Sequence, residues 1–397
     1  MDTITKLLDE ILILNDSEEN HRRRALWDHT YPAVRGEIQW HGIPAGNAAR
    51  GDKMPITVEE MNAIWGKILG FEFVSYYEKP EVYLEYLLKM KIEKFKRLPD
   101  DTSIDLNVPI WLGIPYEAAI LGQKYHHTVE EEPTFDKKPL IADDSNLEPV
   151  FDFENSEMVQ TAIQFYTMIK SFAGDQFNIV FPYWIRGPQG MCLYTRGYEN
   201  FLTDIYLNPD FTRRLLRYVT EAAKAYAAWR ARYLNEPVPL VDLFNDDIPI
   251  IRPQHYRDFI LPFEQEIADF HGGVYYWHSC GNTTKHIPEI MKLRNLKLAD
   301  LGPAIADKPA AIRVFADTDR TKPTEIRFAA DRLVQTATEG QISEYITETI
   351  CACQETGMEK YVLRVSGMSL LLGAEEDLRK LQTWIRVTRK VQNELLS

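Results

Sequence analysis

Two residues that can bind a metal lie two positions apart in the stretch 273–282, which reads Gly-Val-Tyr-Tyr-Trp-His-Ser-Cys-Gly-Asn. Residues 274–277 are β-branched and aromatic, a composition typical of a buried strand. Residues two apart in an extended strand point to the same side, so His278 and Cys280 can present an imidazole and a thiolate to one point. Both groups are good zinc ligands. The stretch predicts a metal site at a strand end; a half-buried His and Cys without metal is the alternative.

The residues after this stretch predict a helix. Gly281 releases the chain from the strand, and Asn282 offers a cap for a helix that runs to about Met291. A strand that ends in polar residues and leads into a helix is how a βα unit builds an active site.

Short apolar segments alternate with longer amphipathic ones along most of the chain. The expected strands are 71–77, 108–113, 177–183, 238–244, 274–277, 296–301, 312–316 and 361–365, and the clearest helices are 80–97, 156–173, 198–207, 209–234, 340–356 and 375–396. This alternation predicts a parallel sheet with crossover helices. A number of units close to eight favours a closed (β/α)8 TIM barrel over an open sheet, and no Gly-x-Gly-x-x-Gly motif follows an early strand.

We expect one domain over residues 1–397, with residues 1–70 as a helical N-terminal extension and loop packed on the barrel. Residues 1–30 read as helix and 31–55 as a loop rich in Gly, Pro and Ala, while Thr57 and Glu60 form a capping box for a helix to about Leu69. The polar stretch 123–150 carries the acidic run 130–132 and predicts a solvated surface loop.

Composition excludes several classes of partner. The formal net charge of −14 argues against nucleic acid and anionic membranes, and the sequence lacks an apolar run of about 18 residues and a signal-peptide pattern. Hydrophobic residues make up 45% of the chain, enough for a full core. Four cysteines in 397 residues suggest a reducing cytoplasm, so we expect a cytoplasmic protein.

If the barrel is right, polar residues at the ends of strands meet at one mouth. Arg186, which precedes Gly187 and Pro188, is expected to point into this mouth and pair with a carboxylate of ligand or protein. The whole set is Glu117, Tyr183, Trp184, Arg186, Asn245, Asp246, Asp247, His278, Cys280, Asp317 and Arg364.

Three segments together resemble the uroporphyrinogen decarboxylase superfamily. The first runs from Arg186-Gly187-Pro188 through residues 196–200 (Arg-Gly-Tyr-Glu-Asn) to Asn208-Pro209. The second begins at residues 245–247 (Asn-Asp-Asp) and continues through Pro253, Tyr256 and Pro262, and the third is residues 278–282 (His-Ser-Cys-Gly-Asn). The resemblance covers about residues 155–300.

The resemblance implies either a decarboxylase or a zinc-dependent methyltransferase. The His-x-Cys-Gly segment is similar to the methyltransferase branch, and the N-terminal Arg-x-x-x-Arg tract of true uroporphyrinogen decarboxylases is missing. The methyltransferase branch usually supplies a further Cys late in the chain, and that position is Ser366 here.

The resemblance also suggests roles for the residues of the mouth. With Ser366 in place of a second Cys, a carboxylate from Asp246, Asp247 or Glu117 would complete a mixed zinc site with His278 and Cys280, and Asp247 is the possible third ligand. Three residues would act in catalysis: Asp247, Glu117 and Tyr183. Substrate would be bound by Arg186, Trp184, Asn245, Trp277 and Arg364, although aromatic residues here could equally be barrel core.

Three functions therefore remain open. The first is a zinc-assisted methyltransferase that moves a methyl group between a small methylated substrate and a corrinoid protein or thiol, as in demethylation systems. The second is a decarboxylase of a tetrapyrrole or other polycarboxylate, with Arg186 and Arg364 as carboxylate clamps. The third is a barrel that only binds a ligand or a corrinoid partner.

Overall fold

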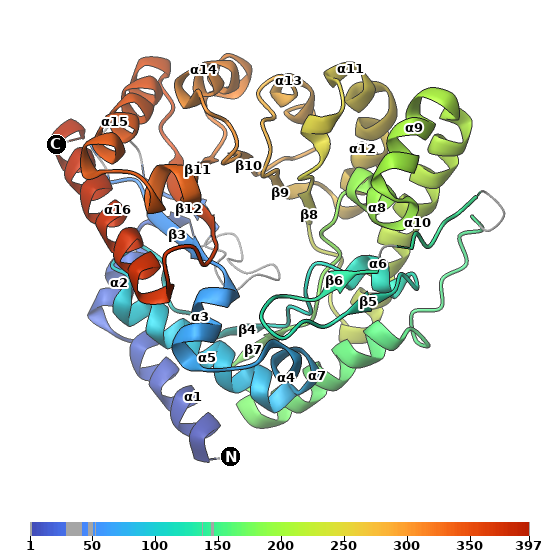
Figure 1. Cartoon of the computed structure of the whole chain (residues 1–397), viewed down its shortest axis with the longest axis horizontal. Helices are drawn as coiled ribbons and strands as arrows, with labels where there is room; N and C mark the ends of the chain where they lie inside the picture. The colour runs from blue at the N-terminus through green and yellow to red at the C-terminus, as the bar shows by residue number, and fades with distance from the viewer. Residues whose placement is uncertain are drawn as a thin grey trace.

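A parallel sheet of six strands forms the centre of the computed structural model, which describes residues 2–28, 42–46, 51, 53–136, 138–143 and 147–396. Neighbouring strands follow the order β3-β12-β11-β10-β9-β8. Their bounds are β3 (Ile56–Glu60), β8 (Val241–Phe244), β9 (Val274–His278), β10 (Leu298–Leu301), β11 (Thr324–Ala329) and β12 (Tyr361–Met368). The predicted parallel α/β class is confirmed, and the sheet is strongly curled (Figure 1).

Both edges of this sheet are occupied. Beyond β8, Phe244 bridges to Arg186, and the chain before Arg186 contains β7 (Asn178–Val180), which pairs in parallel with β4 (Asn107–Pro109). At the other edge, the N–H groups of β3 donate to side chains rather than to a strand: Ile56 N to Asp101 Oδ2 at 2.8 Å and Val58 N to Asp100 Oδ2 at 3.2 Å. These carboxylates satisfy backbone donors that would otherwise be buried unpaired.

The helices lie outside the strands (Figure 1). The apolar residues of these helices recur at helical spacing and so form one face, which is buried against the sheet. Helices predicted from the sequence appear as α5 (Pro80–Arg97), α7 (Glu157–Ala173), α9 (Tyr198–Leu207), α10 (Pro209–Leu234), α15 (Glu339–Thr356) and α16 (Ala374–Leu395). The others are α1 (Asp2–Asn15), α2 (Glu18–Arg24), α3 (Asn62–Leu69), α4 (Phe73–Glu78), α6 (Tyr116–Ile120), α8 (Pro188–Arg196), α11 (Pro253–His255), α12 (Leu261–His271), α13 (Ile287–Ile290) and α14 (Lys308–Asp319).

Two predicted strands are wrong. Most of the segment 71–77 forms α4, because its aromatic rings pack on one another at helical spacing, with the ring centroids of Phe73 and Tyr77 6.2 Å apart. Residues 312–316 lie inside α14, whose start is fixed by the Asp307 side chain accepting from Ala310 N. Asp317 is therefore an exposed helical residue and does not lie at a strand end.

Two strands of the central sheet were not predicted from the sequence. Residues 56–60 form β3, so Thr57 and Glu60 are not a capping box and the helix begins only at Asn62. The strand β11 was hidden because Glu325 and Arg327 interrupt its apolar pattern, although both side chains are buried. The predicted loop 31–55 lies largely outside the described residues, apart from short segments such as β2 (Ile43–Pro44), which pairs with β1 (Trp27–Asp28).

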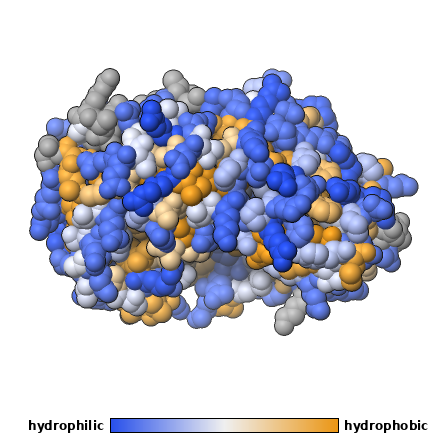
Figure 2. Space-filling model, turned by 90° about the horizontal axis from the view of Figure 1, so that it is seen from above, coloured by the Kyte–Doolittle hydropathy of each residue, from blue (hydrophilic) through white to orange (hydrophobic). Residues whose placement is uncertain are grey.

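In the part of the chain that the structure describes, no helix is both long and apolar enough to cross a membrane. The face seen in Figure 2 is mostly hydrophilic, with hydrophobic residues scattered among the charged ones.

A candidate metal centre

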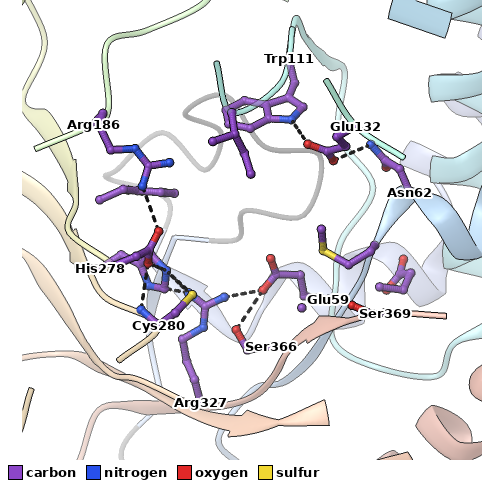
Figure 3. Close-up of a pocket in the computed structure, with 16 residues that line it drawn as sticks. Glu59, Asn62, Trp111, Glu132, Arg186, His278, Cys280, Arg327, Ser366 and Ser369 are labelled. Carbon is purple, nitrogen blue, oxygen red and sulfur yellow. Dashed lines mark hydrogen bonds and ion pairs between the residues drawn. The ribbon is translucent and has the colours of Figure 1, made fainter. Parts of the chain in front are cut away.

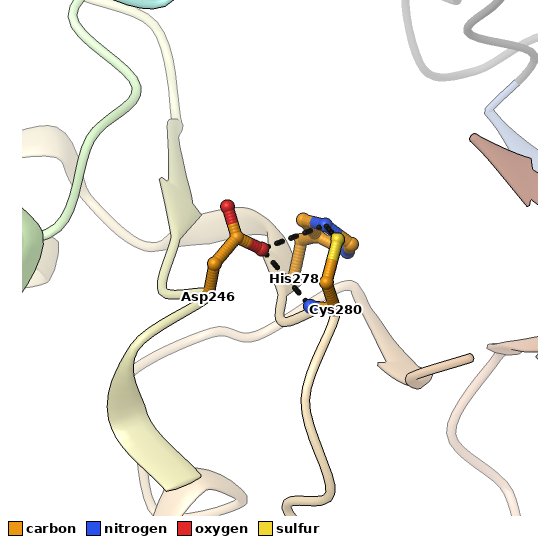
Figure 4. A group of neighbouring side chains, drawn as sticks. All are labelled: Asp246, His278 and Cys280. Carbon is orange, nitrogen blue, oxygen red and sulfur yellow. Dashed lines mark hydrogen bonds and ion pairs between the residues drawn. The ribbon is translucent and has the colours of Figure 1, made fainter. Parts of the chain in front are cut away.

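Three side chains that can bind a metal converge where β8 and β9 end: Asp246, His278 and Cys280 (Figure 4). The His278 Nε2 atom lies 3.2 Å from Asp246 Oδ1 and 3.3 Å from Cys280 Sγ. One possible ligand atom from each residue falls within 4.8 Å of the others. Since β8 and β9 are adjacent parallel strands, their carboxyl ends bring residues 32 to 34 positions apart in sequence to one point.

The backbone around Cys280 is bonded to Asp246 and packs closely on Gly302. Cys280 N donates to Asp246 Oδ1 at 2.9 Å, so the carboxylate orients the turn as well as facing the imidazole. Gly302, just after β10, lies under this turn, and a Cβ at that position would sit 2.2 Å from the Ser279 carbonyl oxygen. A residue with a side chain at 302 would therefore push the Cys280 turn outward.

His278 is oriented by a buried carboxylate from the next strand. Asp300 of β10 contacts His278 Nδ1 through Oδ2, and its Oδ1 accepts from Ser279 N at 3.2 Å. With Nδ1 engaged, Nε2 is the nitrogen that faces Asp246 and Cys280. A carboxylate behind a histidine in this manner fixes the tautomer of metal-binding histidines.

A network of buried charges continues from His278 into the interior of the sheet. Arg327 Nη1 lies 3.5 Å from Asp300 Oδ2, the oxygen that contacts His278, and Arg327 also forms an ion pair with Glu59 of β3. Arg364 bridges Glu59 at 3.1 Å and Glu325 at 3.2 Å. The opposing charges compensate one another, which a buried charge requires.

Arg186 anchors the other side of the cluster. Its Nη1 lies 2.9 Å from Asp246 Oδ2, and its guanidinium lies 5.1 Å from the centre of the Tyr194 ring. Burial alone would raise the pKa of Asp246, but the hydrogen bond and charge of His278 and the charge of Arg186 hold it well below its usual range. Asp246 is therefore ionised at neutral pH.

The other two groups of the cluster hold protons in the absence of metal. Burial and Arg327 oppose the protonation of His278, but Asp300, Cys280 and Asp246 outweigh them and hold the pKa of His278 well above its usual value. Burial raises the pKa of the Cys280 thiol, against the lowering effect of His278.

This donor set fits a divalent ion such as zinc. One carboxylate, one imidazole and one thiol are zinc ligands, and their mutual distances are close to those across a zinc coordination sphere. Binding would also leave the net charge of the buried cluster unchanged, because the divalent ion would displace one proton from His278 and one from Cys280. Asp246, His278 and Cys280 would hold the ion, and Asp300 would fix the imidazole.

A cavity of about 330 Å³ opens beside the cluster (Figure 3). Arg186, His278 and Cys280 line one side of it, while Trp111, Glu132 and Asn62 lie on the opposite side. The rest of the lining is Glu59, Glu60, Met61, Ile114, Phe244, Asp246, Arg327, Ser366, Gly367 and Ser369. A fourth position at the metal could therefore be reached by a small molecule.

The structure brings Arg186, His278 and Cys280 together as predicted, and it places Asp246 rather than Asp247 beside them. The Asp247 carboxylate accepts from the Tyr198 hydroxyl at 2.9 Å and does not line the cavity. After a strand ends, the alternation of sides stops, so the sequence could not distinguish these two carboxylates.

Three other predicted site residues, Glu117, Tyr183 and Trp184, lie behind the cavity lining and pack around the segment that leads to Arg186. Glu117 accepts from the backbone N–H groups of Ile185 (3.0 Å) and Arg186 (3.1 Å) and thereby shapes the Arg186 turn. Tyr183 packs under Arg230, whose guanidinium is 3.8 Å from the ring centre. Trp184 is buried, and its Nε1 donates to the Arg186 carbonyl oxygen at 3.1 Å.

Three further predicted residues are buried in the protein interior. Trp277 donates to Glu264 of α12 at 3.2 Å, so its ring lies on the outer side of the sheet. Asn245 packs against Gly187, where a Cβ would lie 1.9 Å from Asn245 Oδ1. Arg364 is held between Glu325 and Glu59 and does not line the cavity. The roles predicted for all these residues stay predictions.

Sequence reasoning missed Asp300, Arg327, Glu59, Trp111 and Glu132. A charged residue inside an apolar strand segment was a signal for Asp300, because such a residue is buried only with a partner. Glu132 belongs to the acidic run that we expected to be solvated, but its side chain lines the cavity.

The remaining cysteines are all free, and Cys192, Cys351 and Cys353 lie on helices away from the cavity. Ser366 of β12 lines the cavity, with Oγ 3.4 Å from Glu59 Oε2.

Comparisons with known proteins agree with this architecture. The model of the family described as uroporphyrinogen decarboxylase (URO-D) matches residues 68–313. Among solved structures, the chain is similar to a methyltransferase from Methanosarcina mazei, with a TM-score of 0.60 and 13% sequence identity over 86% of this chain and 96% of that chain. At this identity the likeness is one of fold. No curated protein matches the sequence.

Proposed function

Because the chain belongs to the uroporphyrinogen decarboxylase family, we propose that it is a methyltransferase whose activity depends on zinc held by Asp246, His278 and Cys280. The observation that carries this proposal is the convergence of these three side chains on one point beside a cavity. The fold shared with a methyltransferase supports the same choice within the family.

When bound by Asp246, His278 and Cys280, zinc would act as a Lewis acid and stabilise negative charge on a heteroatom of the substrate or on a thiolate. Asp300 would hold His278 so that Nε2 faces the metal position between Asp246 and Cys280, and Arg186 would fix Asp246. The apolar rings of Trp111 and Phe244 exclude water from part of the cavity.

The reaction transfers a methyl group as a cation equivalent. The bond between the methyl carbon and the donor heteroatom breaks, and its electron pair stays with the heteroatom. A lone pair of the acceptor, a thiolate or the reduced corrinoid of a partner protein, forms the new bond to carbon. A methyl group on a neutral ether or thioether leaves an anion that takes up one proton from solvent or from a cavity carboxyl group.

We also infer a closed (β/α)8 barrel, in which β4 and β7 complete the ring between β8 and β3, and a cytoplasmic location. The bridge between Arg186 and Phe244 and the Asp100–Asp101 contacts to β3 support closure. The free cysteines support a reducing compartment.

The decarboxylase alternative gains no support from the site. Its two proposed carboxylate clamps are already paired: Arg186 with Asp246, and Arg364 with Glu325 and Glu59. Arg364 in addition lies outside the cavity lining.

The test is a methyl-transfer assay coupled to metal analysis. The zinc-loaded protein is supplied with an isotopically labelled methylcobalamin donor and a small thiol, and labelled methyl thioether is measured. We expect turnover that is lost in Cys280→Ser together with bound zinc and kept in Cys351→Ser, which makes the same change on α15. Equal activity in the two variants, or decarboxylation of a polycarboxylate by metal-free protein, would contradict the proposal.

A further inference from the structure

The side of the cavity opposite the metal cluster contains a second group of polar residues (Figure 3). Glu132 lies between β5 (Tyr125–His126) and β6 (Thr134–Phe135). Its Oε1 accepts from Asn62 Nδ2 at 3.3 Å, and its Oε2 accepts from Trp111 Nε1 at 3.3 Å. The Tyr77 hydroxyl also bonds to Glu132, and all three partners are neutral, so they orient the carboxylate without cancelling its charge.

Every other carboxylate in the cavity lining is paired with a cation. Asp246 pairs with Arg186 at 2.9 Å, and Glu60 pairs with Lys94 at 3.0 Å. Glu59 forms ion pairs with Arg327 and Arg364. Among the residues that the structure describes, Glu132 alone in this lining forms no ion pair with a Lys or Arg.

An unpaired carboxylate in a partly enclosed site favours a positively charged ligand, because the surrounding protein screens the charge less than water does. The indole of Trp111 strengthens this preference, since an aromatic face attracts an organic cation. The burial of Glu132 raises the pKa of its carboxyl group, which agrees with a missing counter-charge.

We propose that Glu132, Trp111 and Asn62 form a subsite for a positively charged nitrogen of the substrate. The substrate is then a small amine- or ammonium-bearing molecule whose other end reaches Asp246, His278 and Cys280. This inference rests on the proposed function for the role of the metal cluster. The cavity volume of about 330 Å³ limits the ligand to a small molecule.

The test compares two probes of the same shape that differ only in charge. Choline carries a trimethylammonium group, and 3,3-dimethylbutan-1-ol carries carbon in place of that nitrogen. Each is titrated calorimetrically into the full chain as wild type, Glu132→Gln and Glu131→Gln. The last variant makes the same charge change one residue away, on an exposed side chain outside the cavity lining.

We expect choline to bind wild-type protein about tenfold more tightly than the neutral alcohol, and Glu132→Gln to remove about that factor for choline only. Glu131→Gln should change either affinity less than about twofold. Raising the salt concentration should weaken choline binding and leave the alcohol unchanged.

Equal binding of the two probes, unchanged choline affinity in Glu132→Gln, or no saturable binding of choline would overturn the subsite. Zinc content distinguishes this failure from failure of the proposed function. Protein that binds zinc and transfers methyl groups but ignores the charge of the probe refutes the subsite alone. Protein that selects choline through Glu132 but binds no zinc refutes the metal-dependent function alone.

Discussion

Asp300 should control the affinity of the site for zinc although it is not expected to touch the ion. Replacing it with Asn keeps the size of the side chain and allows the amide oxygen to accept from Ser279 N, which now lies 3.2 Å from Asp300 Oδ1. The amide nitrogen then faces His278 Nδ1 and donates to it. That hydrogen bond places the ring proton on Nε2, the nitrogen that would bind zinc.

The expected cost follows from what orienting carboxylates contribute at metal sites. Their loss weakens metal binding by about 10- to 100-fold, equivalent to about 1.4 to 2.8 kcal/mol. We therefore expect Asp300→Asn to raise the Kd for zinc within this range, measured at pH 7.5 by competition with a chromophoric chelator.

Glu325→Gln is the matched control. Glu325 is equally buried and accepts from the Tyr276 hydroxyl at 2.8 Å, as Asp300 does at 3.1 Å, and each carboxylate lies near an arginine. Both variants should unfold at lower denaturant concentration, because each leaves a buried guanidinium short of a partner. Only Asp300→Asn should lose zinc affinity. Equal zinc affinities in the two variants would refute the orienting role of Asp300.

Three further predictions concern the surrounding structure. Gly302→Ala should displace the Cys280 turn, because its Cβ would lie 2.2 Å from the Ser279 carbonyl oxygen. We expect a melting temperature lowered by several degrees together with reduced zinc content, and an unchanged zinc content would contradict this. Arg186→Lys should lower the methyl-transfer rate at least about tenfold while the protein stays folded, because an ammonium group cannot reproduce the guanidinium geometry at Asp246. Unchanged turnover would show that this geometry is unimportant. Burial raises the pKa of the Glu264 carboxyl group to about 7, against an unfolded value of 4.5. The free energy of unfolding of wild type is therefore highest below pH 4.5, where the carboxyl group is neutral in both states, and it falls as pH rises through 7. In denaturant titrations, Glu264→Gln should gain about 3 kcal/mol of stability relative to wild type between pH 4.5 and pH 8, and a pH-independent difference would contradict this.

The sequence was sufficient for the fold class because most strands are short apolar runs between long amphipathic helices. It failed where tertiary contacts override local preference. The inner face of β11 carries Glu325 and Arg327, which are compatible with a buried strand only because Arg364, Glu59 and Asp300 neutralise them. A single segment cannot reveal partners that come from three other strands.

In the candidate site, the sequence could predict residues that share one strand end but not residues that come from neighbouring elements. His278 and Cys280 share a strand end, so their spacing alone predicts that they converge. Asp300 is 22 residues from His278, and their contact depends on β10 lying beside β9, which periodicity does not specify. Glu132 sits in an irregular segment between two short strands, and such a segment gives no pattern from which the direction of a side chain follows.

The most direct test of the metal site is X-ray absorption at the zinc edge of the zinc-loaded wild-type protein. We expect one sulfur atom at about 2.3 Å, from Cys280, and nitrogen or oxygen atoms at about 2.0 to 2.2 Å, from His278, Asp246 and a solvent or substrate atom. A zinc ion without any sulfur neighbour, or one with two sulfur neighbours, would contradict it.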